Sequence, residues 1–197
     1  MLQYIVSGND VQEIIKTATR ALDNGCRWIR LDLRELPQAE IEALVKSLQE
    51  RCNDLEAFLS LENDVENTAE MKVNGVHLGI DSKISAVDAR KRLGEEPFIG
   101  ITVVDAAEVP FIPRNAIDYV AVSSDNIEVC SKVVQQMNAT GLEEPVIALY
   151  SHAIPLPTFM STGINGIAVH HSDTSTSMLP RLINELNAFA EKRLSTL

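Results

Sequence analysis

The chain has 197 residues, of which 45% are hydrophobic and 23% are charged, so we expect an ordered chain with a full apolar core. Its 28 acidic and 17 basic residues give a net charge of −11, which makes DNA or RNA an unfavourable partner. The apolar runs are far shorter than the ~20 residues that a membrane helix needs, and the first residues lack a signal-peptide pattern. These features predict a cytoplasmic protein with neither nucleic acid nor membrane as its partner.

Short apolar runs alternate with helical patterns along the chain. We expect eight strands, at Gln3–Ser7, Trp28–Leu33, Ala57–Glu62, Gly75–Gly79, Phe98–Val103, Ile117–Ser123, Val146–Tyr150 and Asn165–His170. We expect helices at Asp10–Asn24, Pro37–Cys52, Ser85–Leu93, Asn126–Ala139 and Thr176–Leu194. The connections after the third, fifth and seventh strands predict short or irregular helices, and residues 195–197 are expected to fray.

The alternation of strands and helices determines the expected fold class. Strands separated by helices form a parallel sheet, and eight such units predict a closed (β/α)8 barrel, also called a TIM barrel. An open sheet of five strands would leave three apolar runs unused. Because no linker or low-complexity stretch interrupts the pattern, we expect residues 1–197 to form a single domain.

The side chains of a barrel strand point alternately toward the helices and into the barrel. In Trp28–Leu33, the apolar residues Ile29, Leu31 and Leu33 would face the helices. Applied to all the strands, this rule predicts polar inward residues near the carboxyl ends: Arg30, Asp32, Arg34, Glu62, His77, Thr102, Ser123, Tyr150 and His170. Active sites of this fold lie at that end, so the pattern predicts a ligand site there.

Two further interpretations concern the barrel interior. Buried charges need partners, so Arg30, Asp32 and Arg34 could instead form an internal salt-bridge cluster, and both interpretations can hold together. The aromatic residues Trp28 and Tyr119 are expected to fill layers of the barrel core.

Several motifs resemble one protein family in both order and spacing. Gly75-Val-His-Leu-Gly79 is followed by Ala89-Arg-Lys-Arg-Leu-Gly94 and by Phe98-Ile-Gly-Ile-Thr102. This part of the chain resembles the thiamine-phosphate synthases and the TenI-type proteins. The resemblance implies a compact (β/α)8 barrel that is usually a homodimer, and an enzyme or relative of thiamine metabolism.

The resemblance also implies two chemistries. Thiamine-phosphate synthases transfer an aminopyrimidine from its diphosphate to a thiazole phosphate, with release of diphosphate assisted by Mg²⁺. TenI-type proteins aromatise a thiazole tautomer by means of a histidine. Both bind thiazole phosphate at the loops that follow the last two strands. The substrate-binding residues expected from the pattern and the resemblance are Arg30, Arg34, His77, Gly79, Thr102, Tyr150, Gly166 and His170.

The chain departs from the family at several functional positions. It has Arg30-Leu-Asp-Leu-Arg34 where the family has Gln-Leu-Arg-x-Lys. Ser82 stands at the position of a metal-binding aspartate, which leaves Asp81, one residue earlier, as the candidate Mg²⁺ ligand. Tyr150-Ser-His152 replaces a Gly-Gly-Ile turn, and Val104 stands at the TenI histidine.

Three functional hypotheses follow. The first is a protein of this family that binds a phosphorylated thiazole or a similar small ligand without the usual synthase reaction. The second is an active thiamine-phosphate synthase that uses Mg²⁺. The third is a different small-molecule enzyme on the same barrel, in which Glu62 and His77 act as general base and acid.

Overall fold

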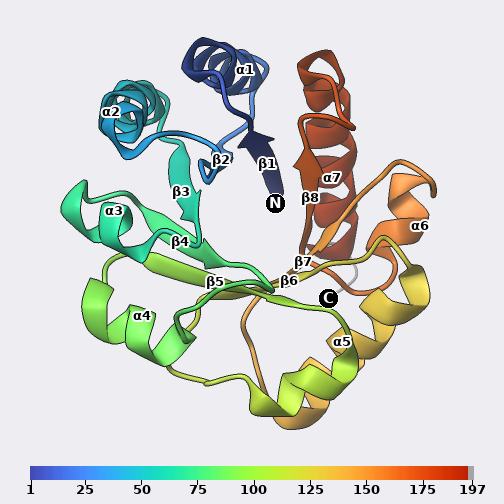
Figure 1. Ribbon diagram of the computed structural model, residues 1–197. Coiled ribbons are helices and arrows are strands. Elements are labelled where there is room, and N and C mark those ends of the chain that lie inside the picture. Colours follow the sequence, from blue (N-terminus) through green and yellow to red (C-terminus); the bar gives the residue numbers. More distant parts are fainter. Residues whose placement is uncertain (195–197) are drawn as a thin grey trace.

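Eight parallel strands close into a barrel in the order of the sequence (Figure 1). The computed structural model describes the backbone of residues 1–194 and the side chains of residues 1–192. Its strands are β1 (Leu2–Ser7), β2 (Trp28–Asp32), β3 (Phe58–Glu62), β4 (Gly75–Leu78), β5 (Phe98–Val103), β6 (Tyr119–Val122), β7 (Val146–Leu149) and β8 (Gly166–His170). The barrel closes where Leu2 of β1 pairs with Ile167 of β8, which confirms the predicted (β/α)8 class.

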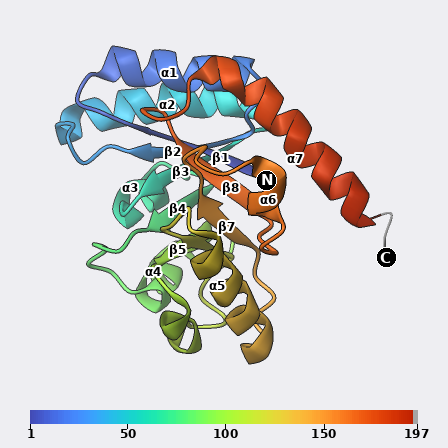
Figure 2. The ribbon, with the colours of Figure 1, turned by 90° about the vertical axis from the view of Figure 1, so that its right-hand side faces the viewer.

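Helices surround the barrel, with α1, α2 and α7 along one side (Figure 2). They are α1 (Val11–Asp23), α2 (Gln38–Asp54), α3 (Val65–Glu70), α4 (Ala86–Leu93), α5 (Ile127–Thr140), α6 (Leu156–Met160) and α7 (Leu179–Leu194), with 3₁₀ turns η1 (Ala106–Phe111) and η2 (Thr176–Met178). The connections after β3, β5 and β7 hold only α3, η1 and α6, as predicted. The expected fraying of residues 195–197 lies outside the described residues.

Local sequence signals explain where the long helices begin and end. The Asp10 side chain accepts hydrogen bonds from the backbone N–H groups of Gln12 and Glu13 and so caps α1. Asn126 caps α5 in the same way, and Gly141 ends that helix in the left-handed conformation that favours glycine. No helix in the described part of the chain is long and apolar enough to cross a membrane.

The core has an outer layer between strands and helices and a smaller layer inside the barrel. The inner layer contains Ile5, Tyr119, Ala121, Ile147 and Ala168, with Trp28 and Phe98 packed against it. The rings of Trp28 and Tyr119 meet edge to face at 4.8 Å between centroids, so their predicted role in the barrel core is confirmed. Gly100 makes room for this packing, because a Cβ there would lie 1.9 Å from Cζ of Tyr119.

The predicted facing of β7 is wrong. Ile147 belongs to the inner layer and Ala148 to the outer one, so Leu149 points toward the barrel mouth and Tyr150 toward the helices. The ring of Tyr150 packs against Phe159 of α6 at 5.2 Å, and its hydroxyl donates to the carbonyl oxygen of Ile154 at 2.8 Å. The reason is that Val-Ile-Ala-Leu is apolar at every position, so its alternation carries no information about facing.

Candidate functional site

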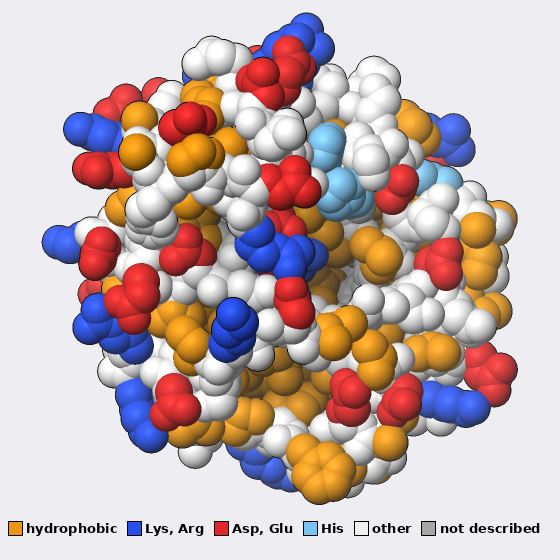
Figure 3. All heavy atoms as spheres, in the orientation of Figure 1, with side chains coloured by type: hydrophobic (Ala, Val, Ile, Leu, Met, Phe, Trp, Pro, Cys, Tyr) orange, Lys and Arg blue, Asp and Glu red, His pale blue; other side chains and the backbone are white. Residues whose placement is uncertain are grey.

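A pocket of about 400 Å³ lies at the carboxyl ends of the strands. Figure 3 shows basic, acidic and histidine side chains gathered around a hollow in the middle of one face. The polar residues that line the pocket are Arg30, Asp32, Arg34, Glu62, Thr102, Ser123, His170 and Asp173. The structure thus brings together seven of the nine polar residues that the alternation assigned to this end; His77 and Tyr150 do not line the pocket.

Arg30 and Glu62 face each other across neighbouring strands β2 and β3. Arg30 Nε lies 3.2 Å from Glu62 Oε2, and both side chains are nearly buried. Neither of these two atoms has a hydrogen-bond partner, so the pair is held by charge rather than by a directed bond. Burial raises the pKa of Glu62, and the charge of Arg30 acts against this effect. A ligand oxygen could therefore gain the hydrogen bond from Arg30 that Glu62 does not make.

Gly79, predicted to bind substrate, instead gives room to this acid. A Cβ at Gly79 would lie 2.5 Å from Glu62 Oε1. The Gly79 N–H donates to Asn63 Oδ1 at 2.8 Å, which ties the loop after β4 to the loop after β3.

Arg34 holds two aspartates at the mouth of the pocket. Its guanidinium donates to Asp32 at 2.9 and 2.7 Å and also to Asp81. Burial alone would raise the pKa of Asp32, but the hydrogen bonds from Arg34 hold it below its usual value. The predicted cluster of Arg30, Asp32 and Arg34 is therefore only partly correct, because Arg30 pairs with Glu62.

The carboxylates near the mouth do not fit a Mg²⁺ ion in this arrangement. Mg²⁺ needs carboxylate oxygens that are free to enter an octahedral shell. Asp81 is bound by Arg34 and by Asn63, whose amide donates to it at 2.8 Å. Glu62 pairs with Arg30, and the Asp64 side chain accepts from the backbone of α3 at Asn67. Among the described residues, no group of three or more His, Cys, Asp or Glu is placed to hold a metal.

His77 lies below the pocket, fully buried in the barrel interior. Its Nδ1 lies 2.7 Å from the Tyr119 hydroxyl and its Nε2 lies 2.7 Å from Thr102 Oγ1. Burial, with a smaller contribution from the charge of Arg30, lowers the pKa of His77 well below 6.5. The hypothesis that His77 and Glu62 act as an acid–base pair needs a pKa of His77 near 7 and contact with the ligand, and the structure provides neither.

His170 lies at the pocket wall and contacts a residue that the sequence analysis missed. Its Nε2 is 3.1 Å from Ser7 Oγ, and its Nδ1 is 2.7 Å from Ser172 Oγ. Burial and the neighbouring His171 lower the pKa of His170, which favours a neutral ring at pH 7. The alternation rule could have identified Ser7, because Tyr4 and Val6 are the outward residues of β1 and Ser7 therefore faces inward.

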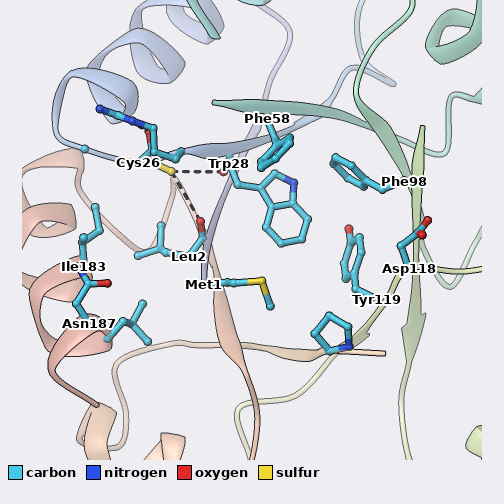
Figure 4. Close-up of a pocket in the computed structure, with 14 residues that line it drawn as sticks. Met1, Leu2, Cys26, Trp28, Phe58, Phe98, Asp118, Tyr119, Ile183 and Asn187 are labelled. Atoms are coloured by element: carbon cyan, nitrogen blue, oxygen red, sulfur yellow. Dashed lines mark hydrogen bonds between the residues drawn. The ribbon is translucent and has the colours of Figure 1, made fainter. Parts of the chain in front are cut away.

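Gly166, another predicted substrate residue, lies at the opposite end of the barrel. A Cβ there would lie 2.3 Å from the carbonyl oxygen of Met1. A second cavity, of about 510 Å³, opens at this end and is lined by the aromatic residues Trp28, Phe58, Phe98 and Tyr119 (Figure 4).

The second cavity offers little chemistry. Asp118 at its edge is engaged by Arg90 and by the backbone N–H of Ile99, and the remaining lining is mainly apolar. The converging polar groups therefore identify the pocket at the carboxyl ends as the candidate site.

Comparison with known proteins points to one family. A family model described as thiamine monophosphate synthase matches residues 2–172. The chain is 31% identical to a thiamine-phosphate synthase of Bacteroides fragilis, over 85% of this chain and 89% of that protein. It is 32% identical to a thiamine-phosphate synthase of Bacteroides thetaiotaomicron, over 85% and 87%. A thiamine phosphate pyrophosphorylase from Pyrococcus furiosus shares the fold, with a TM-score of 0.77, 19% identity, and 96% and 95% coverage of the two chains.

Proposed function

Since the chain belongs to the thiamine monophosphate synthase family, we propose that it binds a phosphorylated thiazole or a similar small phosphorylated molecule at the carboxyl end of its barrel. The observation that carries this proposal is Arg30, which lines the pocket and whose buried Nε makes no hydrogen bond. A phosphate oxygen is a strong acceptor for such a guanidinium group.

The charges around Arg30 allow a phosphate ligand to replace an internal carboxylate as the partner of a guanidinium group. Without a ligand, Glu62 and Asp32 balance the two arginines that line the pocket. A dianionic phosphate competes with these carboxylates for the same guanidinium groups. Because Arg34 is about half exposed, it can turn from its aspartates toward a ligand at little cost in burial.

The synthase reaction is the second candidate function, and the relatives favour it. The two Bacteroides proteins, at about 30% identity, are named thiamine-phosphate synthases. In that reaction Arg30 and Arg34 would bind the phosphate groups of the substrates. Asp81, Glu62 and Asp64 are already paired within the protein, so their carboxylates are not free to bind Mg²⁺ in this arrangement.

A thermal-shift titration tests the binding proposal. Thiazole phosphate should raise the unfolding midpoint of the protein, whereas the thiazole alcohol without phosphate should raise it much less, because binding to the folded state alone adds stability. The double variant Arg30→Met/Glu62→Gln removes both charges together and should abolish the shift. Arg92→Met, which removes an exposed pair with Glu66 on the outer surface, is the control. An equal shift in the double variant would contradict the proposal.

A turnover assay separates the two candidates. The protein is incubated with Mg²⁺, aminopyrimidine diphosphate and thiazole phosphate, and thiamine phosphate is measured. Formation of thiamine phosphate at a rate proportional to protein concentration would establish the synthase reaction. Binding of thiazole phosphate without turnover would leave ligand binding as the function.

A further inference from the structure

A line of hydrogen-bonding side chains crosses the barrel interior and ends at the pocket. Gln3 Nε2 donates to the Tyr119 hydroxyl at 3.2 Å, the hydroxyl lies 2.7 Å from His77 Nδ1, and His77 Nε2 lies 2.7 Å from Thr102 Oγ1. Gln3, Tyr119 and His77 are buried. Thr102 alone reaches the wall of the pocket. The line therefore connects the closed interior to the place where a ligand would lie.

The groups at the buried end determine which atom donates and which atom accepts in each of these hydrogen bonds. Burial raises the pKa of Tyr119 to about 12, while the nearby Arg30 guanidinium and the Gln3 amide act against this rise by charge and by hydrogen bonding to the hydroxyl. The Gln3 amide nitrogen can only donate, so the Tyr119 oxygen accepts at this end.

The Tyr119 hydroxyl accepts from Gln3, and its own hydrogen has His77 Nδ1, at 2.7 Å, as its acceptor. A neutral imidazole carries one N–H, which must then be on Nε2 and donate to Thr102 Oγ1. The Thr102 hydroxyl accepts from the histidine, so the hydrogen of this hydroxyl can be donated to a ligand in the pocket.

We propose that Gln3, Tyr119 and His77 are positioning residues that present the Thr102 hydroxyl to the pocket as a hydrogen-bond donor. This inference rests on the proposed function for the identity of the ligand. It deepens that function by requiring a ligand with an acceptor atom, such as a phosphate oxygen or an unprotonated ring nitrogen, beside Thr102. A ligand with an N–H or O–H donor at that place would leave the Thr102 hydrogen without an acceptor and would bind less well.

The tautomer of His77 tests the inference without any ligand. In protein labelled with ¹⁵N at histidine, two-bond proton–nitrogen correlations should show His77 protonated on Nε2 and unprotonated on Nδ1. Tyr119→Phe removes the donor to Nδ1 and should change this pattern. Ser60→Ala is the matched control, since Ser60 is another buried hydroxyl in the barrel that contacts Trp28 instead. His77 protonated on Nδ1 in the unaltered protein would overturn the proposal.

Ligand affinity provides the second readout. Thr102→Val should weaken thiazole phosphate binding about tenfold, as expected for a lost hydrogen bond to a charged ligand, whereas Thr102→Ser should retain the affinity. Tyr119→Phe should weaken binding in the unaltered background but have no further effect once Thr102 is valine. If the two substitutions weakened binding independently, with additive losses of affinity, the proposal that Tyr119 acts through Thr102 would be overturned.

The two proposals fail in different ways. If thiazole phosphate does not bind at all, the proposed function fails. The tautomer measurement still decides whether His77 donates to Thr102. If the ligand binds but Thr102→Val leaves the affinity unchanged, the inference fails and the proposed function stands.

Discussion

His77 matches a family motif, but its role depends on how deeply it is buried in the barrel. It follows the alternation rule and faces inward, one layer below Thr102, where its ring is closed off by Tyr119. A neutral histidine in such a place is a hydrogen-bonding bridge, because taking up a proton would bury a charge. The sequence predicts that His77 faces inward, but its depth depends on how the large rings of Trp28 and Tyr119 fill the layers beneath it.

The buried histidine predicts a pH dependence of stability. The pKa of His77 is depressed in the folded protein, so below about 6.5 the unfolded chain binds a proton that the folded protein does not. The unfolding free energy should therefore fall as pH drops from 7 to 5, with His77 contributing up to about 1.4 kcal/mol per pH unit. Urea unfolding at several pH values checks this against His77→Asn, which should lose that share of the slope. Parallel slopes in the two proteins would contradict the account.

Gly100 predicts a second effect at the same scale. Adding a Cβ there would place it 1.9 Å from Cζ of Tyr119, so Gly100→Ala must displace the ring at the centre of the inner layer. We expect a loss of about 1–3 kcal/mol in the unfolding free energy, typical of overpacking a core. Gly94→Ala is a useful comparison, since a Cβ there meets no atom within 4 Å but must tolerate a φ of 75°. Denaturant unfolding with near-ultraviolet circular dichroism should report a disturbed aromatic signal for Gly100→Ala only.

At the scale of elements, the strands that could be placed from sequence are those with a clear alternation. β2 alternates apolar and charged residues, so its facing follows directly, and Arg30, Asp32 and Arg34 line the pocket as expected. β7 has no polar residue, and its facing was decided by packing: Ile147 fills the inner layer and Tyr150 packs on α6.

The pairing of charges could not be predicted, because it depends on register and on rotamers. Arg30 aligns with Ser60 and Glu62 with His77 in the two ladders of β3, and this stagger sets Glu62 beside Arg30. The sequence shows that the charges must find partners but not which ones.

The facing of β7 yields a prediction about ligand binding. Tyr150→Phe should leave the affinity for thiazole phosphate unchanged, because the hydroxyl bonds to Ile154 outside the pocket. It should lower stability by about 0.5–1.5 kcal/mol, the usual value of one hydrogen bond. Leu149→Asp places a negative charge at the pocket wall and should weaken binding. Calorimetric titration of both variants measures this; weaker binding in Tyr150→Phe alone would show that the ligand lies elsewhere.

At the scale of the whole molecule, 197 residues and eight repeated units were enough to predict the closed barrel. The two ends of that barrel differ in chemistry: the pocket at one end is lined by arginines, acids and a histidine, and the cavity at the other end is lined by aromatic rings. The protein has a net charge of −11, yet two arginines line the pocket at the carboxyl end. Without a ligand, their acidic partners neutralise the charge of these arginines, and an anionic ligand would compete with those partners.

A crystal structure of the protein soaked with thiazole phosphate would show directly where the ligand binds. We expect electron density for the ligand at the carboxyl ends of the strands, with a phosphate oxygen within hydrogen-bond distance of Arg30 and an acceptor atom beside Thr102. Density for the ligand in the aromatic cavity beside Trp28 and Phe58, or at the carboxyl end with its phosphate turned away from Arg30, would contradict it.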